Sequence, residues 1–308
     1  MSSPTKTIVV TGATGKQGGA LIDALLAAPG GANFHVVAVT RSSAGPRAQA
    51  LATRPNVSVV AGDIDDPEAI FAQIAASGKG PVWGLYIVQV NSDAEEAQGR
   101  ALVDAATAHG VRHVVYSSSD RGGPVKSAGN PTRVKNFAAK FHIEKYLEAV
   151  AAGSAEATKM TYTILRPVTF FDNLTNDVHG RGFARMWEQM GDRKLQMVST
   201  RDIGWFAAQA FLRPEVYTNV ALSLVGDELT QAEADLAFRQ AVGAPMPLAP
   251  CPVASAVKFF LKGTVGDMFR WFEEEGYGGD VAECRRLHPQ MQDFKSWISA
   301  NKGQWAQQ

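Results

Sequence analysis

Three glycines near the start of the chain have the spacing of a phosphate-binding turn. Gly12, Gly15 and Gly18 lie between the apolar run 7–11 and a stretch rich in Ala and Leu. In such a turn the first glycine permits a sharp bend, the second lets backbone approach a pyrophosphate, and the third lets the next helix pack closely on the strand. That helix would present unpaired N–H groups to the anion. The sequence therefore predicts a dinucleotide site, and the alternative is a glycine-rich turn without a ligand.

The residues after the second apolar run indicate which dinucleotide would bind. Sites that prefer NAD usually carry Asp or Glu about 20 residues after the glycines, where the carboxylate bonds the ribose 2′-hydroxyl. Here the run 36–40 ends in Arg41 and Ser42, and a guanidinium beside a hydroxyl suits a 2′-phosphate. Lys16, within the glycine turn, would add a second cation. We therefore expect NADP(H) rather than NAD(H), with a solvated Arg41 as the alternative.

Acidic residues follow the third apolar run. Asp63 could accept a hydrogen bond from an adenine amino group, with Ile64 against the ring. The alternative for Asp63 is a helix N-cap, although Asp66 before Pro67 already suits that role. Both roles can be filled, because two acids are present.

Alternating apolar runs and Ala-rich stretches predict the elements that would position these groups. Strands are expected at 7–11, 35–40, 57–61, 83–90, 113–117 and 161–166, and helices at 15–28, 46–53, 67–76, 94–109 and 133–152. Apolar strands separated by helices are typical of a parallel sheet covered on both faces. Right-handed crossovers then give an α/β fold, a Rossmann-type doubly wound parallel sheet with helices on both faces.

After Pro167 the pattern is less regular. Helices are expected at 183–190, 202–211, 257–262, 267–274 and 290–300, and a strand at 220–225. The run Thr230-Gln-Ala-Glu233 has the form of a capping box that opens a helix to about residue 242. We expect residues 1–170 to form the Rossmann core, completed by a strand near 219–226. Residues 171–308 would form mainly a smaller C-terminal substrate or cap region with a discontinuous boundary.

The composition limits the class of protein. The 308 residues include 30 basic and 30 acidic side chains, and this balance argues against a general nucleic-acid binder, although 121–140 is locally basic. No apolar stretch approaches the ~20 residues of a membrane span, and the first residues lack the apolar segment of a signal peptide. Cys251 and Cys284 are the only cysteines, as expected in a reducing compartment. We expect a cytoplasmic protein that binds no metal, nucleic acid or membrane.

These motifs resemble the atypical short-chain dehydrogenase/reductase superfamily and, within it, the NmrA-like family. The resemblance covers nearly the whole chain and rests on the following segments: the glycine turn, Val39-Thr-Arg41, Gly62-Asp63, Tyr116-Ser-Ser-Ser119, Arg166-Pro-Val-Thr-Phe-Phe-Asp-Asn173, Asp202-Ile-Gly204 and Trp271-Phe-Glu-Glu-Glu-Gly-Tyr277. It implies a Rossmann fold with a small C-terminal substrate region. The family holds both NAD(P)(H)-dependent reductases and catalytically silent redox sensors.

The resemblance also implies where the nicotinamide half of a cofactor would lie. Phe170 and Asn173, after Pro167, would lie against the nicotinamide, while Val88 and Gln89 would lie near the ribose. Core packing is the alternative for one member of the Phe170–Phe171 pair. The full set of candidate cofactor-binding residues is Gly12, Thr14, Gly15, Lys16, Gln17, Gly18, Arg41, Ser42, Asp63, Ile64, Val88, Gln89, Ser117, Lys140, Pro167, Phe170 and Asn173.

The chain departs from the superfamily pattern on the helix expected at 133–152. Ordinary members carry Tyr-x-x-x-Lys there, but none of the six tyrosines here has Lys four residues later. Lys140 is present, and Asn136 stands where the phenol would be. In isoflavone-reductase-like enzymes a lone Lys in a similar setting is thought to be the acid/base. Lys140 is therefore a candidate catalytic acid/base, a group that only positions the nicotinamide ribose, or a solvated helix lysine.

Serines at the end of the fifth apolar run are further candidates. Ser117, Ser118 and Ser119 follow the strand at its carboxyl end, where ligands of open α/β sheets gather. Ser118 is the candidate for bonding a substrate carbonyl, and plain turn formation is the alternative.

Two functions are consistent with these residues. One is an NADPH-dependent reductase that transfers hydride to a quinone, an enone or a carbonyl, with a small apolar or aromatic substrate. The other is a catalytically silent NADP(H) sensor that acts through a protein partner. The late aromatics, which could be core or substrate pocket, are Phe259, Phe260, Phe269, Trp271 and Phe272.

Overall fold

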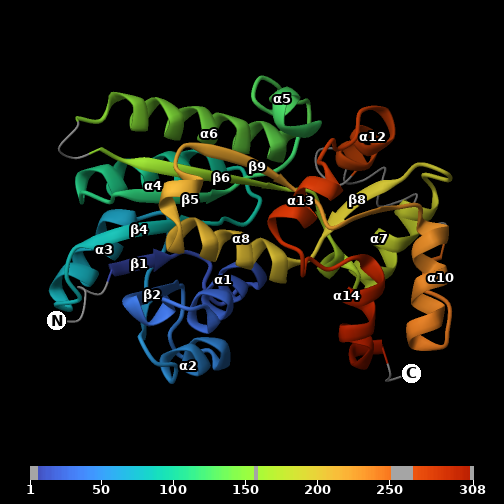
Figure 1. Ribbon diagram of the computed structural model, residues 1–308, viewed down its shortest axis with the longest axis horizontal. Helices are drawn as coiled ribbons and strands as arrows, with labels where there is room; N and C mark the ends of the chain where they lie inside the picture. Colours follow the sequence, from blue (N-terminus) through green and yellow to red (C-terminus); the bar gives the residue numbers. More distant parts are fainter. Residues whose placement is uncertain (1–5, 156–158, 251–265, 306–308) are drawn as a thin grey trace. The chain divides into compact units, whose positions relative to one another are not determined.

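A seven-stranded sheet forms the main layer of the structure (Figure 1). The computed structural model describes residues 6–155, 159–250 and 266–305. The strands of this sheet are β1 (Lys6–Val10), β2 (Phe34–Thr40), β3 (Val57–Ala61), β4 (Val82–Ile87), β5 (His113–Ser117), β6 (Thr161–Pro167) and β9 (Val220–Leu224). Their order is β3-β2-β1-β4-β5-β6-β9, and each pairing from β3 to β6 is parallel. This order confirms the predicted Rossmann-type α/β fold.

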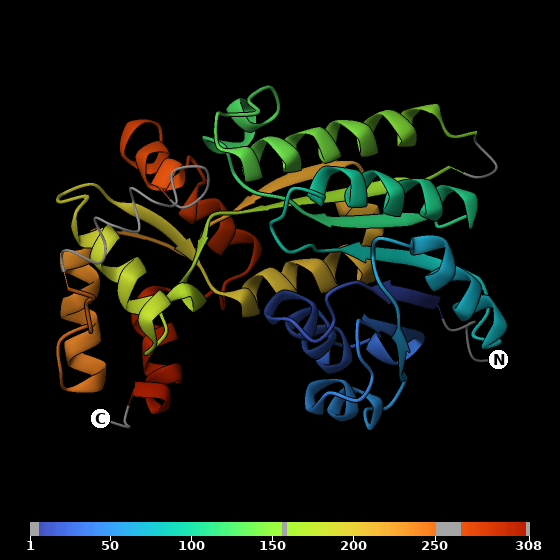
Figure 2. The same ribbon diagram turned by 180° about the vertical axis from the view of Figure 1, so that it is seen from behind.

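Helices cover both faces of the sheet. On one face, α3 (Pro67–Ala76), α4 (Glu95–Ala108) and α6 (Lys135–Gly153) share a hydrophobic cluster with the strands. Figures 1 and 2 show α4 and α6 side by side. The other face carries α1 (Lys16–Ala27) and α8 (Thr200–Leu212), while α2 (Pro46–Ala52) follows β2. Helices α1 and α8 are packed so closely that a Cβ atom at Gly204 would lie 2.4 Å from the carbonyl carbon of Ala20.

The predicted strands and helices of the first half agree with the structure to within three residues. The largest difference is β4, which ends at Ile87 instead of residue 90. The chain leaves the sheet there because the Val88 N–H donates to the hydroxyl of Thr11, at 2.9 Å, in place of a strand partner. The predicted capping box is confirmed at the start of α10 (Gln231–Val242) by reciprocal bonds between Thr230 and Glu233.

A second sheet of three strands was not predicted from the sequence. It consists of β7 (Thr169–Phe170), β8 (Leu195–Val198) and β10 (Asp227–Leu229) in the order β10-β8-β7. Strands of two to four residues are too short to show an apolar period. The remaining elements are η1 (Gly31–Asn33), α5 (Gly123–Ser127), η3 (Phe171–Asn173), α7 (Val178–Glu188), α9 (Pro214–Tyr217), α12 (Asp267–Glu274), α13 (Val281–Leu287), α14 (Phe294–Asn301) and η5 (Lys302–Trp305). The helix expected at 257–262, Cys251, Phe259 and Phe260 lie outside the described residues.

The chain divides into two compact units. Unit 1 consists of Met1–Ser118, Ala139–Leu165 and Ile203–Leu222, and unit 2 of Ser119–Ala138, Arg166–Asp202 and Ser223–Gln308. Unit 2 has an aromatic core that includes Phe171, Trp187, Phe269, Trp271, Phe272, Phe294 and Trp297. The core interpretation of the late aromatics is therefore confirmed for Phe269, Trp271 and Phe272. The predicted boundary near residue 170 stays a prediction.

A buried carboxylate joins three segments of unit 2. Asp120 accepts hydrogen bonds from the backbone N–H groups of Gly122 at 2.9 Å, Gly123 at 3.0 Å and Gly278 at 3.0 Å. The hydroxyl of Ser223 donates to its second oxygen at 2.5 Å. Four donors replace the water that burial removes, so this carboxylate is a structural anchor.

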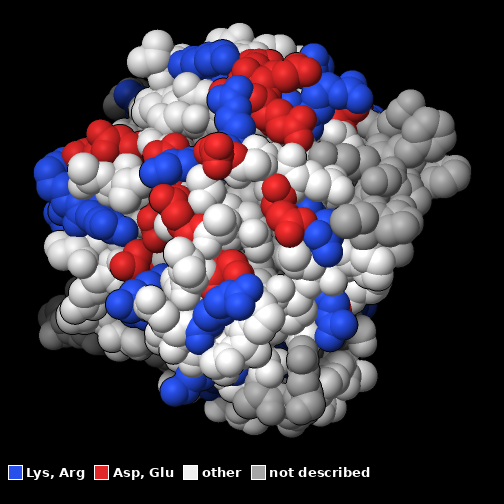
Figure 3. All heavy atoms as spheres, turned by 90° about the vertical axis from the view of Figure 1, so that its right-hand side faces the viewer, with Lys and Arg blue, Asp and Glu red and all other residues white. Residues whose placement is uncertain are grey.

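Charged side chains of both signs are interspersed on the face shown in Figure 3. The basic segment 121–140 is partly neutralised, because Lys126 pairs with Glu275 at 2.9 Å and Arg133 pairs with Glu274. Arg121 is fully buried and donates to backbone carbonyls, including that of Ser119 at 2.8 Å. These contacts use part of the positive charge of the segment within unit 2. Within the described ranges, no helix is long and apolar enough to span a membrane.

A buried histidine of unit 1 predicts a pH dependence of folding. His113 Nδ1 lies 2.8 Å from the hydroxyl of Thr161, and Nε2 lies 3.1 Å from that of Thr163. Burial lowers the pKa of His113 to about 4, and the charge of Lys6 acts in the same direction. Between pH ~6.5 and 4, His113 therefore binds a proton in the unfolded chain but stays neutral in the folded chain.

We therefore expect the free energy of unfolding to keep its full value above pH ~6.5, as far as His113 determines it, and to decrease as the pH falls toward 4. At pH ~5 the loss attributable to His113 should be about 2 kcal/mol. Urea unfolding at neutral pH and at pH ~5 measures it, with the non-titrating variant His113→Gln as the control. An identical pH dependence in the two proteins would contradict this assignment.

Candidate functional site

The glycine turn between β1 and α1 has the geometry that the sequence predicts. Gly12 has a φ of 57°, in the left-handed region, and a Cβ atom there would lie 2.9 Å from Val88 Cγ1. The N–H of Gly15 closes the turn by donating to the Gly12 carbonyl at 2.8 Å. A Cβ atom at Gly18 would lie only 2.4 Å from that carbonyl oxygen. Gly12 is thus required by its left-handed backbone and by the close Val88 side chain, and Gly18 by the close approach of backbone to backbone.

The amino end of α1 fits a phosphate group. Gly15 is the N-cap residue, and no side chain of the described residues caps this helix end. The first turn also contains no acidic residue. The N–H groups at the start of α1 therefore keep their capacity to bind an anion, and the helix dipole favours negative charge there. A dinucleotide pyrophosphate fits this arrangement.

Three basic residues lie along the turn and the loop after β2. Lys16 is the first residue of α1 and is exposed, as are Arg41 and Ser42 at the end of β2. Arg47 in α2 donates from Nη1 to the carbonyl of Thr14, at 3.1 Å. Arg47 was not among the predicted site residues, although Pro46-Arg47 at a helix start, in the loop that carries Arg41, is a signal for it.

The loop after β4 connects the glycine turn to Lys140. The hydroxyl of Thr11 lies 3.1 Å from the Val88 carbonyl oxygen, and Gln89 Nε2 donates to the backbone carbonyl of Glu95 at 2.8 Å. The carboxylate of Glu95 forms an ion pair with the Lys140 ammonium. Glu95 thus joins Gln89, which lies next to the glycine turn, to Lys140 on α6. Glu95 was not among the predicted site residues.

The predicted serines are engaged with other side chains. Ser117 donates to Gln17 Oε1 at 2.6 Å, which connects the end of β5 with α1. Ser118 is buried and donates to the buried carboxylate of Glu144. Glu144 lies four residues after Lys140, so both groups project from one side of α6. The Ser118 proton is therefore committed to Glu144, and its role toward a substrate carbonyl stays a prediction.

The acidic residues after β3 have local roles. Asp63 Oδ1 accepts from the backbone N–H of Asp65 at 3.1 Å, while Asp66 caps α3 by accepting from Ala69 at 3.1 Å. The N-cap alternative for Asp63 is therefore wrong, and the cap role of Asp66 is confirmed. Ile64 is partly buried against the hydrophobic cluster of unit 1. The adenine contacts of Asp63 and Ile64 stay predictions.

The three candidates after β6 belong to unit 2. The carbonyl of Pro167 accepts from the Asp120 N–H at 3.1 Å, Phe170 is half-buried in β7, and Asn173 is exposed. Phe171 is completely buried, with its ring 5.6 Å from that of Phe294. Phe171 is the core-packing member of the aromatic pair, and the cofactor contacts of the other three residues stay predictions.

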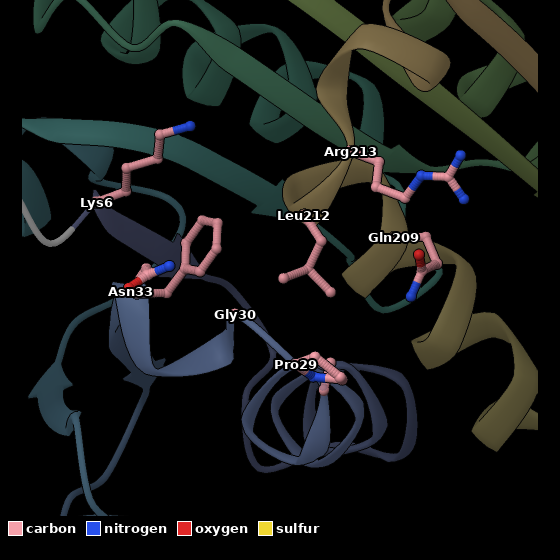
Figure 4. A pocket seen from close by; sticks show the side chains of 9 residues that line it. Lys6, Pro29, Gly30, Asn33, Gln209, Leu212 and Arg213 are labelled. Atoms are coloured by element: carbon pink, nitrogen blue, oxygen red, sulfur yellow. The ribbon is translucent and has the colours of Figure 1, made fainter. Parts of the chain in front are cut away.

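A pocket of about 430 Å³ in unit 1 lies away from these residues (Figure 4). It includes Lys6 and Phe34, the first residues of β1 and β2, together with Leu212 and Arg213 at the end of α8. A five-residue strand spans about 16 Å, so the pocket is at the opposite edge of the sheet from the glycine turn. In Figure 4 the guanidinium of Arg213 is directed away from Lys6. This pocket contains none of the predicted site residues.

Comparison with known proteins agrees with the motifs. The model of the NmrA-like family matches residues 4–298. The chain belongs to the NmrA-like family. A curated relative is the NmrA-like family domain-containing oxidoreductase FrzB of Cladobotryum sp, which is 32% identical over 178 residues, or 54% of this chain and 47% of the relative. The chain spans about half the length of the curated relatives it matches.

Solved structures share the fold of this NmrA-like chain. The triphenylmethane reductase of Citrobacter sp., solved with NADP(H), has a TM-score of 0.71 at 19% identity and covers 96% of this chain and 99% of its own. NmrA, a negative transcriptional regulator solved with NADP, has a TM-score of 0.69 at 20% identity over 96% and 95%. A reductase and a regulator therefore share the fold of this chain.

Two adjacent glycines provide a matched test of the turn in this NmrA-like protein. A Cβ atom at Gly18 would meet backbone at 2.4 Å, whereas at Gly19 the nearest contact is 3.7 Å. We expect Gly18→Ala to lower the free energy of unfolding by about 2 kcal/mol or more, because α1 must move off the turn.

Gly19→Ala serves as the control and should change stability by less than about 1 kcal/mol, in the stabilising direction, since Ala favours a helix. Urea unfolding of both variants measures the difference. Equal effects of the two substitutions would show that close approach at Gly18 does not limit the turn.

Proposed function

We propose that this NmrA-like chain binds NADP(H) and acts as a reductase on a small apolar or aromatic quinone, enone or carbonyl compound. The observation that carries the proposal is the amino end of α1, which has no side-chain cap in the described residues, begins with Lys16 and follows the Thr14 carbonyl that Arg47 contacts. Gly12, Gly15 and Gly18 would hold the pyrophosphate. Arg41 and Ser42 would receive the 2′-phosphate, with Lys16 as the second cation. The NADP(H) complexes of proteins with the same fold support this choice of cofactor.

Lys140 is the residue of this chain that would handle a proton. Bound NADPH supplies a hydride. The acceptor also needs a proton at oxygen, and the ammonium of Lys140 holds one at Nζ in a half-buried position. The second possible role of Lys140 is to bond the nicotinamide ribose without giving up a proton. The oxidoreductase relatives favour the first role.

A sensor function is the second candidate. Asn136 stands in place of the usual Tyr, Lys140 is paired with Glu95, and Ser118 is committed to Glu144. A site with its polar groups so engaged suits a protein that binds NADP(H) and signals through a protein partner. NmrA, which shares the fold, is a regulator.

One assay separates these functions. The purified protein is incubated with NADPH and a panel of quinones, enones and aldehydes, and the absorbance of NADPH is followed. Turnover that Lys140→Met abolishes supports the reductase with Lys140 as proton source. Tight binding of NADPH without turnover across the panel supports the sensor instead.

The choice between NADPH and NADH gives a separate prediction. Arg41→Ala should weaken NADPH binding by about tenfold or more and leave NADH binding unchanged, because the lost bonds are charge-assisted and go to the 2′-phosphate. Arg47→Ala should weaken both cofactors, since Arg47 contacts the carbonyl of Thr14 in the turn that both would use. Calorimetric titrations give these constants. Equal losses of NADPH and NADH affinity in Arg41→Ala would refute the 2′-phosphate assignment.

A further inference from the structure

The Lys140–Glu95 pair is the buried charge cluster closest to the proposed chemistry. The Lys140 side chain is 12% exposed and the Glu95 side chain 0% exposed. Both residues belong to unit 1, Glu95 as the first residue of α4 and Lys140 on the neighbouring helix α6. Anions are favourable in the first turn of a helix, and this partly explains why a carboxylate is tolerated there.

The backbone of Glu95 is itself held in place. Its carbonyl accepts the hydrogen bond from Gln89 Nε2 at 2.8 Å. Gln89 directly follows Val88, whose N–H donates to Thr11 at the start of the glycine turn. The position of the Glu95 carboxylate is therefore tied to the residues proposed to bind the dinucleotide.

The fold gains little stability from this pair. Glu95 Oε2 is buried and has no hydrogen-bond partner within the part of the chain that the structure describes. Taking a carboxylate and an ammonium out of water costs several kcal/mol per ion, and a single ion pair with an unsatisfied oxygen compensates this cost poorly. A role in fixing Lys140 explains the pair better than a role in stability.

We propose that Glu95 is a positioning residue for Lys140. Its carboxylate holds Nζ in one place. The contacts that fix this carboxylate begin at the glycine turn and pass through Val88 and Gln89. The effect on cofactor binding rests on the proposed function, because it needs NADPH near Lys140. The effect on Lys140 itself does not.

The first experiment measures Lys140 without any cofactor. Acylation of Lys140 by an N-hydroxysuccinimide ester is followed by peptide mass spectrometry in the natural protein, in Glu95→Gln and in Glu96→Gln. Removing the Glu95 carboxylate removes the ion pair that holds Nζ and frees the side chain to reach the ester, so the rate should rise by about fivefold or more. Glu96 is a matched control, since it is next in sequence but pairs with Arg100 at the surface.

Lys145 on the same helix is the internal reference, because it pairs with Glu148 and lies near Lys140. Its rate should stay unchanged in Glu95→Gln. An unchanged rate at Lys140, or a rise that Lys145 shares, overturns the proposal, because the second result would mean local opening of α6.

The second experiment measures binding of NADPH and of 2′,5′-ADP, which lacks the nicotinamide half. Glu95→Gln should weaken NADPH binding by about tenfold and leave 2′,5′-ADP binding unchanged. In a Lys140→Met background, Glu95→Gln should add no further loss, since its effect passes through Lys140. A loss shared by 2′,5′-ADP, a loss that persists in the Lys140→Met background, or no loss of NADPH affinity would overturn positioning at the cofactor.

The two experiments separate failure of this inference from failure of the proposed function. If the natural protein binds no NADPH but Glu95→Gln accelerates the acylation of Lys140, Glu95 positions Lys140 and the proposed function is wrong. If NADPH binds and the acylation rate does not change, the proposed cofactor stands and the role of Glu95 is wrong.

Discussion

The close approach of the glycine turn to α1 sets the geometry of unit 1 at the carboxyl edge of its sheet. With a Cβ atom at Gly18 only 2.4 Å from the carbonyl oxygen of Gly12, α1 can begin directly on the turn only because Gly18 has no side chain. The left-handed Gly12 also lies against Val88, and the hydroxyl of Thr11 joins the ends of β1 and β4. Through Gln89 this arrangement extends to the first turn of α4. A steric constraint at two backbone positions therefore places a helix amino end, a loop and a buried carboxylate with respect to one another.

Two buried carboxylates of this chain illustrate different uses of the same chemistry. Asp120 in unit 2 receives three backbone N–H donors and the Ser223 hydroxyl, so its negative charge is solvated by the protein and joins separate segments. Glu95 in unit 1 has the ion pair with Lys140 on one oxygen and no hydrogen-bond partner in the described chain on the other. Burial without enough donors costs free energy. A buried carboxylate whose oxygens all accept hydrogen bonds is thus expected of a structural anchor. A buried carboxylate with an unsatisfied oxygen is expected of a residue that acts on its neighbour.

A feature of the fold or of the site can be predicted from the sequence when the residues that it needs are close together in the chain. The glycine turn, the cap at Asp66 and the capping box at Thr230 are predictable, because the residue types and spacings that they need lie within one turn of backbone. The strands β7, β8 and β10 are not predictable, since their pairing partners are distant in sequence and the strands are too short to show an apolar period. Glu95 has the appearance of an ordinary acid in a first helical turn, and its partner is 45 residues away. Two other site residues do carry a local signal: Glu144, at four residues from Lys140, and Arg47, which follows Pro46 at a helix start in the loop that carries Arg41.

Water reaches the Lys140–Glu95 pair from one side only, and this asymmetry bears on the two candidate functions. The ammonium is 12% exposed, whereas the carboxylate is not exposed at all. In a reductase, a proton that leaves Nζ must therefore return through the exposed part of Lys140, because Glu95 has no contact with solvent. A substrate that covers this part while it is bound would delay the return until product has left. A sensor has no such requirement, because an Nζ held in one place is sufficient to bind a cofactor. The residual exposure of Lys140 is thus a property that the reductase function needs and the sensor function does not.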